Sequence, residues 1–280
     1  MPAHNPLNVA EDVAMLDHMT GGRAYAGFAR GYQDRWVNTL GQALGVGATS
    51  SDKSQRDLDN RRAFEESWDI IKLAWTQDTF SYDGHFWKIP PPDTQWDIPA
   101  TLKWGKGAQV GGALKEIGIS PHPLQKPHPP VYAPFTFSAT TSRFWAREGG
   151  RPVVISDDVE FCKTLFQVYM DEANGAGREL RYGQGMGGAL CLGETPEQAQ
   201  EMRDQFDWLF ETWFVPFGFP PGLVFQGTPE QVTEQIRGLH NELQFPELFL
   251  WLNTGLVDHN LMMRQLEFFA TNVMPNFAGE

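Results

Sequence analysis

A hydroxyl-rich turn at residues 137–142 is the segment of this sequence best suited to binding an anion. It carries four hydroxyl side chains between a predicted strand, 131–135, and a predicted helix, 139–148. Hydroxyls and unpaired backbone N–H groups at a helix N-terminus form a ready anion site. No acidic residue occurs from 131 to 147 that would repel a phosphate. The turn therefore predicts phosphate binding, although the same residue types would also make an ordinary helix cap.

Arg30 is the second candidate ligand, because it directly follows a short apolar strand predicted for 24–29. An arginine at the carboxyl end of a barrel strand points into the active face, and its guanidinium can bind phosphate through two N–H groups. A salt bridge at the rim of the sheet is the alternative. Tyr32 could line the same face or pack under a loop. We expect Arg30 and the 138–142 turn to converge on one anionic group.

The other reactive side chains give weaker signals. Cys162 and Cys191 are the only cysteines, and they form neither a disulfide framework nor a metal motif. Three histidines lie in a proline-rich stretch without a ligand partner at metal spacing, and we interpret them as structural: His85, His122 and His128. The sequence therefore predicts no metal site, and it identifies no catalytic base.

Alternating strands and helices are predicted to position these residues. Short apolar runs indicate strands at 24–29, 131–135, 152–155, 186–192 and 248–252. Helical periodicity and capping residues indicate helices at 7–20, 56–75, 139–148, 157–172, 195–210, from 228 onward and at 258–274. Such alternation is typical of a parallel sheet covered by helices.

Two of these helices begin with the same four residues, Thr-Pro-Glu-Gln, at 195–198 and 228–231. Both copies fit a capping box, in which threonine caps the helix and glutamine reaches back to the threonine N–H.

A proline-rich stretch, 77–130, lies between the second and third predicted helices. Its prolines lack backbone N–H donors, so it cannot consist mostly of regular secondary structure. A loop this long is usually a lid over a functional site, although it could also be a surface loop without a function.

Aromatic residues gather between 208 and 219. They could form an apolar lid over a hydrophobic substrate, a core contact or a dimer face.

Two architectures fit five strands. One is a complete, open five-stranded α/β sheet. The other is the last part of a (β/α)8 barrel, a fold of eight strands and about 250 residues. Because the chain opens on a helix, a barrel would place about 90 further residues upstream of Met1. Periodicity leaves both architectures open.

Composition excludes several classes of partner. The 280 residues carry a formal net charge of −13, which repels phosphate backbones and anionic lipids. No apolar run is long enough to span a membrane, and the first residues lack the features of a signal peptide. We therefore expect a cytoplasmic protein that binds neither nucleic acid nor membrane.

A set of motifs resembles the bacterial luciferase-like, flavin-dependent monooxygenases. The first helix runs into Gly21-Gly22-Arg23, and the strand after it ends in Arg30-Gly31-Tyr32. The matching blocks occur in family order over essentially the whole chain, at 4–17, 19–23, 27–32, 80–87, 125–132, 225–232, 268–270 and 273–275. The resemblance implies the barrel: one luciferase-like domain, 1–280, that holds about the last five strands of a (β/α)8 barrel, lacks its N-terminal part and includes the 77–130 loop.

The same resemblance implies a function. Members of the family bind reduced FMN or, in some branches, the deazaflavin F420. The expected activity is a flavin-dependent monooxygenation of a small organic substrate by reduced FMN and O2, in a homodimer supplied by a separate flavin reductase. An F420-dependent oxidoreductase and a flavin-binding relic without activity are the alternatives. The cofactor-binding residues carried over are Arg30, Tyr32, Ser138, Ala139 through its N–H, and Ser142. The family's catalytic histidine follows a strand upstream of Met1, so none is assigned here.

Overall fold

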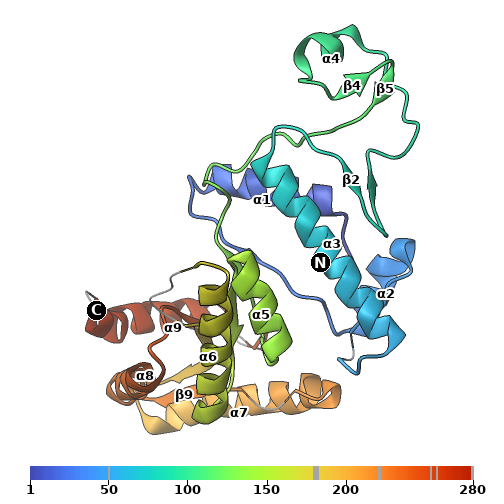
Figure 1. The fold of residues 1–280 in the computed structure, drawn as a ribbon. Helices are drawn as coiled ribbons and strands as arrows, with labels where there is room; N and C mark the ends of the chain where they lie inside the picture. The colour runs from blue at the N-terminus through green and yellow to red at the C-terminus, as the bar shows by residue number, and fades with distance from the viewer. Residues whose placement is uncertain (50, 179–182, 220–221, 253, 257, 279–280) are drawn as a thin grey trace. The chain divides into compact units, whose positions relative to one another are not determined.

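The computed structural model describes residues 1–49, 51–178, 183–219, 222–252, 254–256 and 258–278. The chain divides into two compact units, Met1–Val131 and Tyr132–Glu280. The first runs from blue to green in Figure 1 and the second from green to red. The sequence predicts that residues 1–280 form one domain, and this stays a prediction.

Two helices form the centre of the first unit, α1 (Pro6–Met19) and α3 (Gln55–Thr76). Helix α1 begins where the Asn5 side chain accepts a hydrogen bond from the Leu7 N–H, and Gly21, at φ +63°, lets the chain turn away after its end. The Trp75 indole N–H donates to the Ala10 carbonyl across the two helices at 3.0 Å. Trp75 also packs against Trp68, with 6.2 Å between ring centroids. The Trp75 indole, buried beside Trp68 of the same helix, thus connects α3 to α1 through this hydrogen bond.

Short elements complete this unit. Strand β1 (Ala26–Gly27) is the observed part of the strand predicted at 24–29, and the Ala26 N–H donates to the Pro130 carbonyl. Helix α2 (Asp34–Leu40) and the 3-10 turn η1 (Gly41–Leu44) were not predicted. The reason is that α2 buries only Val37, which leaves no apolar period in the sequence.

The proline-rich stretch at 77–130 contains only short pieces of structure, as its prolines predict. These pieces are β2 (Tyr82–Asp83), β3 (Lys88–Ile89), α4 (Pro99–Trp104), β4 (Gln109–Val110) and β5 (Ala113–Leu114). The strands form two antiparallel pairs, β2 with β3 and β4 with β5. None of the pairs extends into a longer ladder within the described residues.

Two buried carboxylates tie this stretch to the helices. Glu66 of α3 accepts the backbone N–H groups of His85, Phe86 and Trp87 at 2.7–2.9 Å, in the turn between β2 and β3. Asp17 of α1 accepts both the backbone N–H and the side-chain amide of Gln125, each at 2.8 Å. The stretch is therefore fixed to its own unit at both ends by charge-assisted hydrogen bonds.

A parallel sheet forms the second unit. Its strands are β6 (Val131–Ala133), β7 (Arg151–Val154), β8 (Gly185–Leu192), β9 (Val224–Gly227) and β10 (Leu248–Trp251). They lie in the order β6-β7-β8-β10, and β9 pairs with the second half of β8. All these pairs are parallel. The predicted α/β fold with a parallel sheet is confirmed, while β9 was not predicted.

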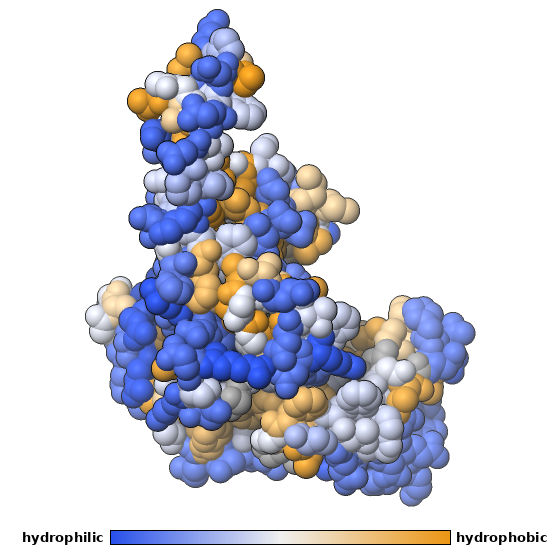
Figure 2. Space-filling view, turned by 90° about the vertical axis from the view of Figure 1, so that its right-hand side faces the viewer, coloured by the Kyte–Doolittle hydropathy of each residue, from blue (hydrophilic) through white to orange (hydrophobic). Residues whose placement is uncertain are grey.

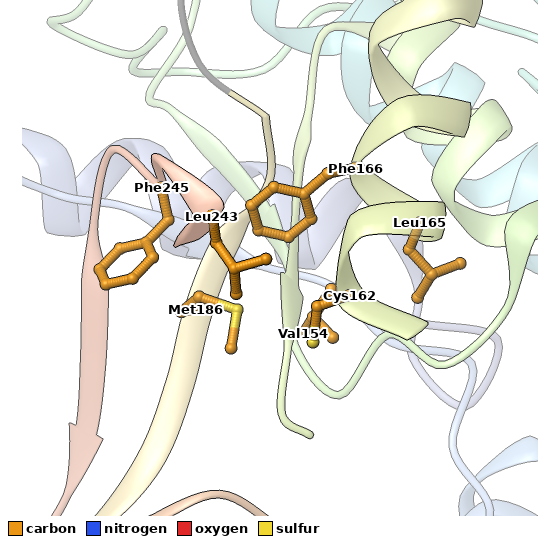
Figure 3. Close-up of a cluster of buried hydrophobic side chains, with 7 residues drawn as sticks. All are labelled: Val154, Cys162, Leu165, Phe166, Met186, Leu243 and Phe245. Atoms are coloured by element: carbon orange, nitrogen blue, oxygen red, sulfur yellow. The ribbon is translucent and has the colours of Figure 1, made fainter. Parts of the chain in front are cut away.

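Helices cover both faces of the long strand β8. These are α5 (Ala139–Glu148), α6 (Val159–Gly175), α7 (Pro196–Trp213), α8 (Pro229–Leu243) and α9 (His259–Asn272), with 3-10 turns η2 (Val215–Phe217) and η3 (Met274–Phe277). Helices α5 and α6 lie side by side (Figure 1). Along β8, Met186 packs with residues of α6 and α8 (Figure 3), whereas Cys191 packs with α7. Alternate side chains of a strand point to opposite faces, so α7 covers the face opposite α6 and α8.

The helix caps follow the sequence signals with two corrections. Helix α6 follows the N-cap Asp158, whose side chain accepts the Phe161 N–H, and thus starts at Val159 instead of residue 157 as predicted. The full capping box occurs at Thr228, where Gln231 reaches back to the threonine N–H. At the other copy, Gln198 accepts the N–H of Glu194 instead.

The surface carries both polar and apolar side chains. Apolar side chains reach it in small groups among hydrophilic ones on the face shown in Figure 2. Among the described helices, none combines the length and hydropathy needed to cross a membrane.

Candidate functional site

The N-terminus of α5 keeps unpaired donors where the sequence predicts a phosphate site. Ser138 is the N-cap, and its hydroxyl accepts the Thr141 N–H at 3.2 Å. The Ser142 N–H donates to the Ser138 carbonyl. Among the described residues, the N–H groups of Ala139 and Thr140 have no hydrogen-bond partner. The first turn carries no acidic residue, so two donors and the positive end of the helix dipole remain available to an anion.

Ser142 differs from the other residues of this turn because its side chain lies in the core. It is 0% exposed, and its hydroxyl donates to the side-chain oxygen of Gln184 at 3.2 Å. The amide nitrogen of Gln184 in turn donates to the Leu165 carbonyl. The Ser142 hydroxyl is directed into the protein, and the Ser138 hydroxyl donates to the Thr141 hydroxyl at 2.9 Å. The turn therefore offers an anion the two backbone N–H groups.

Arg30 lies in the first unit and forms an ion pair. Its Nη1 is 3.0 Å from Oδ1 of Asp57 and also donates to the Asp57 carbonyl at 3.3 Å. Both side chains are largely buried. Burial and then the positive charge of Arg61 lower the pKa of Arg30, while the charge of Asp57 opposes this shift. Because both bonds use Nη1, the pair with Asp57 leaves Nε and Nη2 to other ligands.

Asp57 is itself held by several donors at the start of α3. Burial raises its pKa, but the hydrogen bond from the Thr49 hydroxyl, the charge of Arg30 and the bond from the Lys53 N–H together bring it below the ordinary value. Asp57 is therefore ionised at neutral pH and fixes the guanidinium of Arg30 in one orientation.

Tyr32 is half-buried, and its hydroxyl accepts a hydrogen bond from the Gln33 side chain at 3.2 Å. Thus Ser138 and Ala139 lie together in the second unit, while Arg30 and Tyr32 belong to the first. The convergence of these two groups on one phosphate stays a prediction.

Aromatic rings gather at the carboxyl ends of the strands, beside the α5 turn. Phe135 follows β6, Trp251 ends β10, and Phe214 caps α7. Phe214 and Trp251 have their ring centroids 5.6 Å apart, and Phe135 lies 6.2 Å from Phe214. The aromatic residues at 208–219 are among the candidates predicted from the sequence, whereas Phe135 is not. An aromatic residue directly after a strand, preceded by proline, is the signal that could have found it.

The histidines and cysteines make structural contacts. The His128 ring packs 5.4 Å from Trp75, and His122 bonds the Gln77 carbonyl. Burial raises the pKa of Cys162 to about 11 and that of Cys191 to about 12. Across the described parts of the chain, no three potential metal ligands lie together.

A sequence model of one family, described as luciferase-like monooxygenase, matches residues 1–243. The alkanal monooxygenase alpha chain of the Kryptophanaron alfredi symbiont is 25% identical over 157 residues, which cover 56% of this chain and 32% of that protein. The chain thus spans about a third of the length of this relative.

Two solved structures share the fold. The oxygenating constituent of 3,6-diketocamphane monooxygenase from Pseudomonas putida, in complex with FMN, has a TM-score of 0.72 and 17% identity over 98% of this chain and 77% of that one. The F420-dependent tetrahydromethanopterin reductase of Methanopyrus kandleri has a TM-score of 0.65 and 14% identity over 98% and 80%. At these identities the likeness concerns the fold, which is that of luciferase-like barrel enzymes.

Proposed function

Since this chain belongs to the luciferase-like monooxygenase family, we propose that it is a flavin-dependent monooxygenase that binds reduced FMN and oxygenates a small organic substrate with O2. The observation that carries the proposal is the α5 N-terminus, where the Ala139 and Thr140 N–H groups are unpaired and no acidic side chain is near in sequence. A phosphate monoester needs such donors, and the first turn of α5 supplies them at the carboxyl end of β6.

The residues present fit this cofactor. Reduced FMN supplies the electrons that let one atom of O2 enter the substrate while the other leaves as water. The phosphate would be held by the Ala139 and Thr140 N–H groups of the α5 turn. Arg30, held by Asp57 through Nη1, has Nε and Nη2 to offer a phosphate oxygen.

An F420-dependent oxidoreductase is the second candidate, and the fold shared with an F420-dependent reductase favours it. F420 chemistry moves a hydride and does not require O2, so oxygen uptake separates the two. A separate flavin reductase, a homodimer and a cytoplasmic location complete the proposal.

The test uses this chain as it is. It is loaded under anaerobic conditions with chemically reduced FMN or with reduced F420. Aerated buffer with n-decanal as the probe substrate is then added, and oxygen uptake above that of the free cofactor is followed. We expect oxygen uptake and an oxidised decanal product from the protein loaded with FMN, and neither from the protein loaded with F420. Oxidation of reduced F420 without oxygen uptake would contradict the monooxygenase. FMN binding without any substrate oxidation would instead favour a flavin-binding protein without activity.

A further inference from the structure

A small lobe within the first unit, residues 93–117, is folded almost without a core, and we call it the tip lobe. It consists of α4 and the hairpin of β4 and β5, which backbone hydrogen bonds extend to residues 94–96. The tip lobe stands apart from α1 and α3 in Figure 1. The structure describes all of its residues, and only Ala108 and Gln109 among them are buried.

Hydrogen bonds, rather than apolar burial, hold the tip lobe in shape. At its base the Thr79 hydroxyl donates to the Glu116 carboxylate at 2.6 Å, and Phe80 pairs with Ile117 through the backbone. The buried amide of Gln109 has no hydrogen-bond partner on its nitrogen or its oxygen, and this costs free energy. Because apolar burial normally offsets the entropy lost in ordering a chain, the tip lobe lacks its main source of stability when the chain is alone.

The tip lobe exposes the side chains that could supply this burial. Trp104 is 72% exposed, Leu102 66%, Val110 60%, Ile98 47% and Trp96 43%. Apolar side chains reach the surface of the lobe at the top of Figure 2. At about 150–250 Å² for a large side chain, the five present roughly 600 Å², which approaches the ~800 Å² that each partner contributes to a stable protein interface.

Charge favours a second copy of the same lobe as the partner. The tip lobe carries three acidic and three basic residues, whereas the chain carries a net charge of −13, so the whole net charge lies outside the lobe. Two such acidic chains repel each other, and an anionic surface would repel them too. The neutral lobe is the part at which two copies can meet without adding to this repulsion, and its mixed charges can pair across a two-fold axis.

We propose that the tip lobe binds the tip lobe of a second copy of this chain, and that the five exposed apolar side chains form the core of the contact. Trp104 and Leu102 are the most exposed of the five, and aromatic anchors dominate the energy of such contacts. The proposal gives a contact surface to the homodimer, and it does not depend on the cofactor or the reaction, because the residues of the flavin site lie outside 93–117.

Sedimentation velocity of the full chain over a wide range of protein concentration tests the proposal. We expect the wild type to form a reversible dimer, and Trp104→Ala to raise the dimer dissociation constant about tenfold or more. Trp36→Ala is the matched control, because Trp36 is 58% exposed on α2 of the same unit, and it should leave the dissociation constant unchanged. Far-UV circular dichroism checks that both variants keep the fold.

A thiol cross-link tests whether two lobes meet. Leu102→Cys places one accessible thiol in the tip lobe, since the native Cys162 and Cys191 are buried. A short bismaleimide should join two copies of Leu102→Cys into a covalent dimer, whereas Trp36→Cys should stay uncoupled.

Three results would overturn the proposal. The first is a wild type that stays monomeric at every concentration. The second is a dimer that Trp104→Ala does not weaken, or that the Leu102→Cys thiols do not cross-link, because either would place the contact on another face. The third is a monomeric wild type that co-sediments with phosphatidylcholine vesicles while Trp104→Ala does not, which would assign the lobe to a lipid surface. FMN titration is read separately, so failure of the flavin function would leave the lobe contact standing.

Discussion

Replacing Asp17 by alanine should destabilise the first unit more than any change on the exposed side of α1. Asp17 is fully buried, and its two oxygens accept the backbone N–H and the side-chain amide of Gln125. The amide nitrogen of Gln125 also donates to the Ala24 carbonyl at 2.9 Å, so it would keep one partner. The Gln125 N–H would have none.

The hydrogen bonds of Asp17 determine the expected loss in the free energy of unfolding. A hydrogen bond to a charged group contributes about 1.5–3 kcal/mol, and a buried donor left unpaired adds its desolvation cost. Two such bonds, one of them partly compensated by Ala24, give a loss of about 3–4 kcal/mol for Asp17→Ala. Asp12→Ala, an exposed acidic residue on the same helix, should change stability by about 0.5 kcal/mol or less.

Urea unfolding followed by tryptophan fluorescence measures this loss, because Trp68 and Trp75 are buried beside α1. Burial raises the pKa of Asp17, but the hydrogen bonds from Gln125 and its neighbours lower it below the ordinary value. A carboxyl with a lowered folded pKa contributes stability above its unfolded pKa of about 3.9, and that stability is lost as the pH falls through the folded value. The difference between wild type and Asp17→Ala should therefore shrink in acid.

A loss below about 1 kcal/mol at neutral pH would refute this reasoning, since it is smaller than one charged hydrogen bond. So would a double-mutant cycle with Gln125→Ala that shows the two changes to be additive, because contacting partners should couple.

Two further predictions concern buried groups. Glu66→Ala should accelerate amide hydrogen exchange throughout the turn between β2 and β3, because the Glu66 carboxylate accepts three N–H groups of that turn. Glu66→Gln should have a smaller effect. Unchanged exchange in Glu66→Ala would show that the turn is stable without the carboxylate. Because burial raises the pKa of Cys162 to about 11 and of Cys191 to about 12, neither thiol should react with a disulfide reagent at pH 8 until urea unfolds the chain; rapid labelling of the native protein would contradict this.

The sequence predicts those elements that are long enough to show a period or a cap. Helix α5 has the predicted bounds because Ser138 caps it and Gly149, in a left-handed conformation, ends it. Strand β10 was predicted from its continuous apolar run, which is typical of a parallel strand buried on both faces. Among the described strands it pairs with β8 alone, at the end of the strand order, and Phe249 is 41% exposed. Strand β9 is as long as β10, but two of its four residues are Gln226 and Gly227, so it shows no continuous apolar run.

The candidate site is predictable where its parts are adjacent in the chain. The hydroxyl of Ser138 and the N–H of Ala139 follow from one helix start. The partners of Ser142 and Arg30 do not, because Gln184 lies 42 residues from Ser142 and Asp57 lies 27 residues from Arg30. Pairing at such separations depends on tertiary packing, which a local pattern does not encode.

Comparing FMN with riboflavin tests the phosphate site at the α5 N-terminus most directly, because the two flavins differ only in the phosphate. Ala139→Pro removes one N–H at the first helical residue, where proline is tolerated, and His259→Pro makes the same change at the start of α9 as a control. We predict that the wild type and His259→Pro prefer FMN to riboflavin, and that Ala139→Pro weakens FMN binding about tenfold without changing riboflavin binding. Equal affinity of the wild type for the two flavins, or FMN binding that ignores Ala139→Pro, would contradict the account.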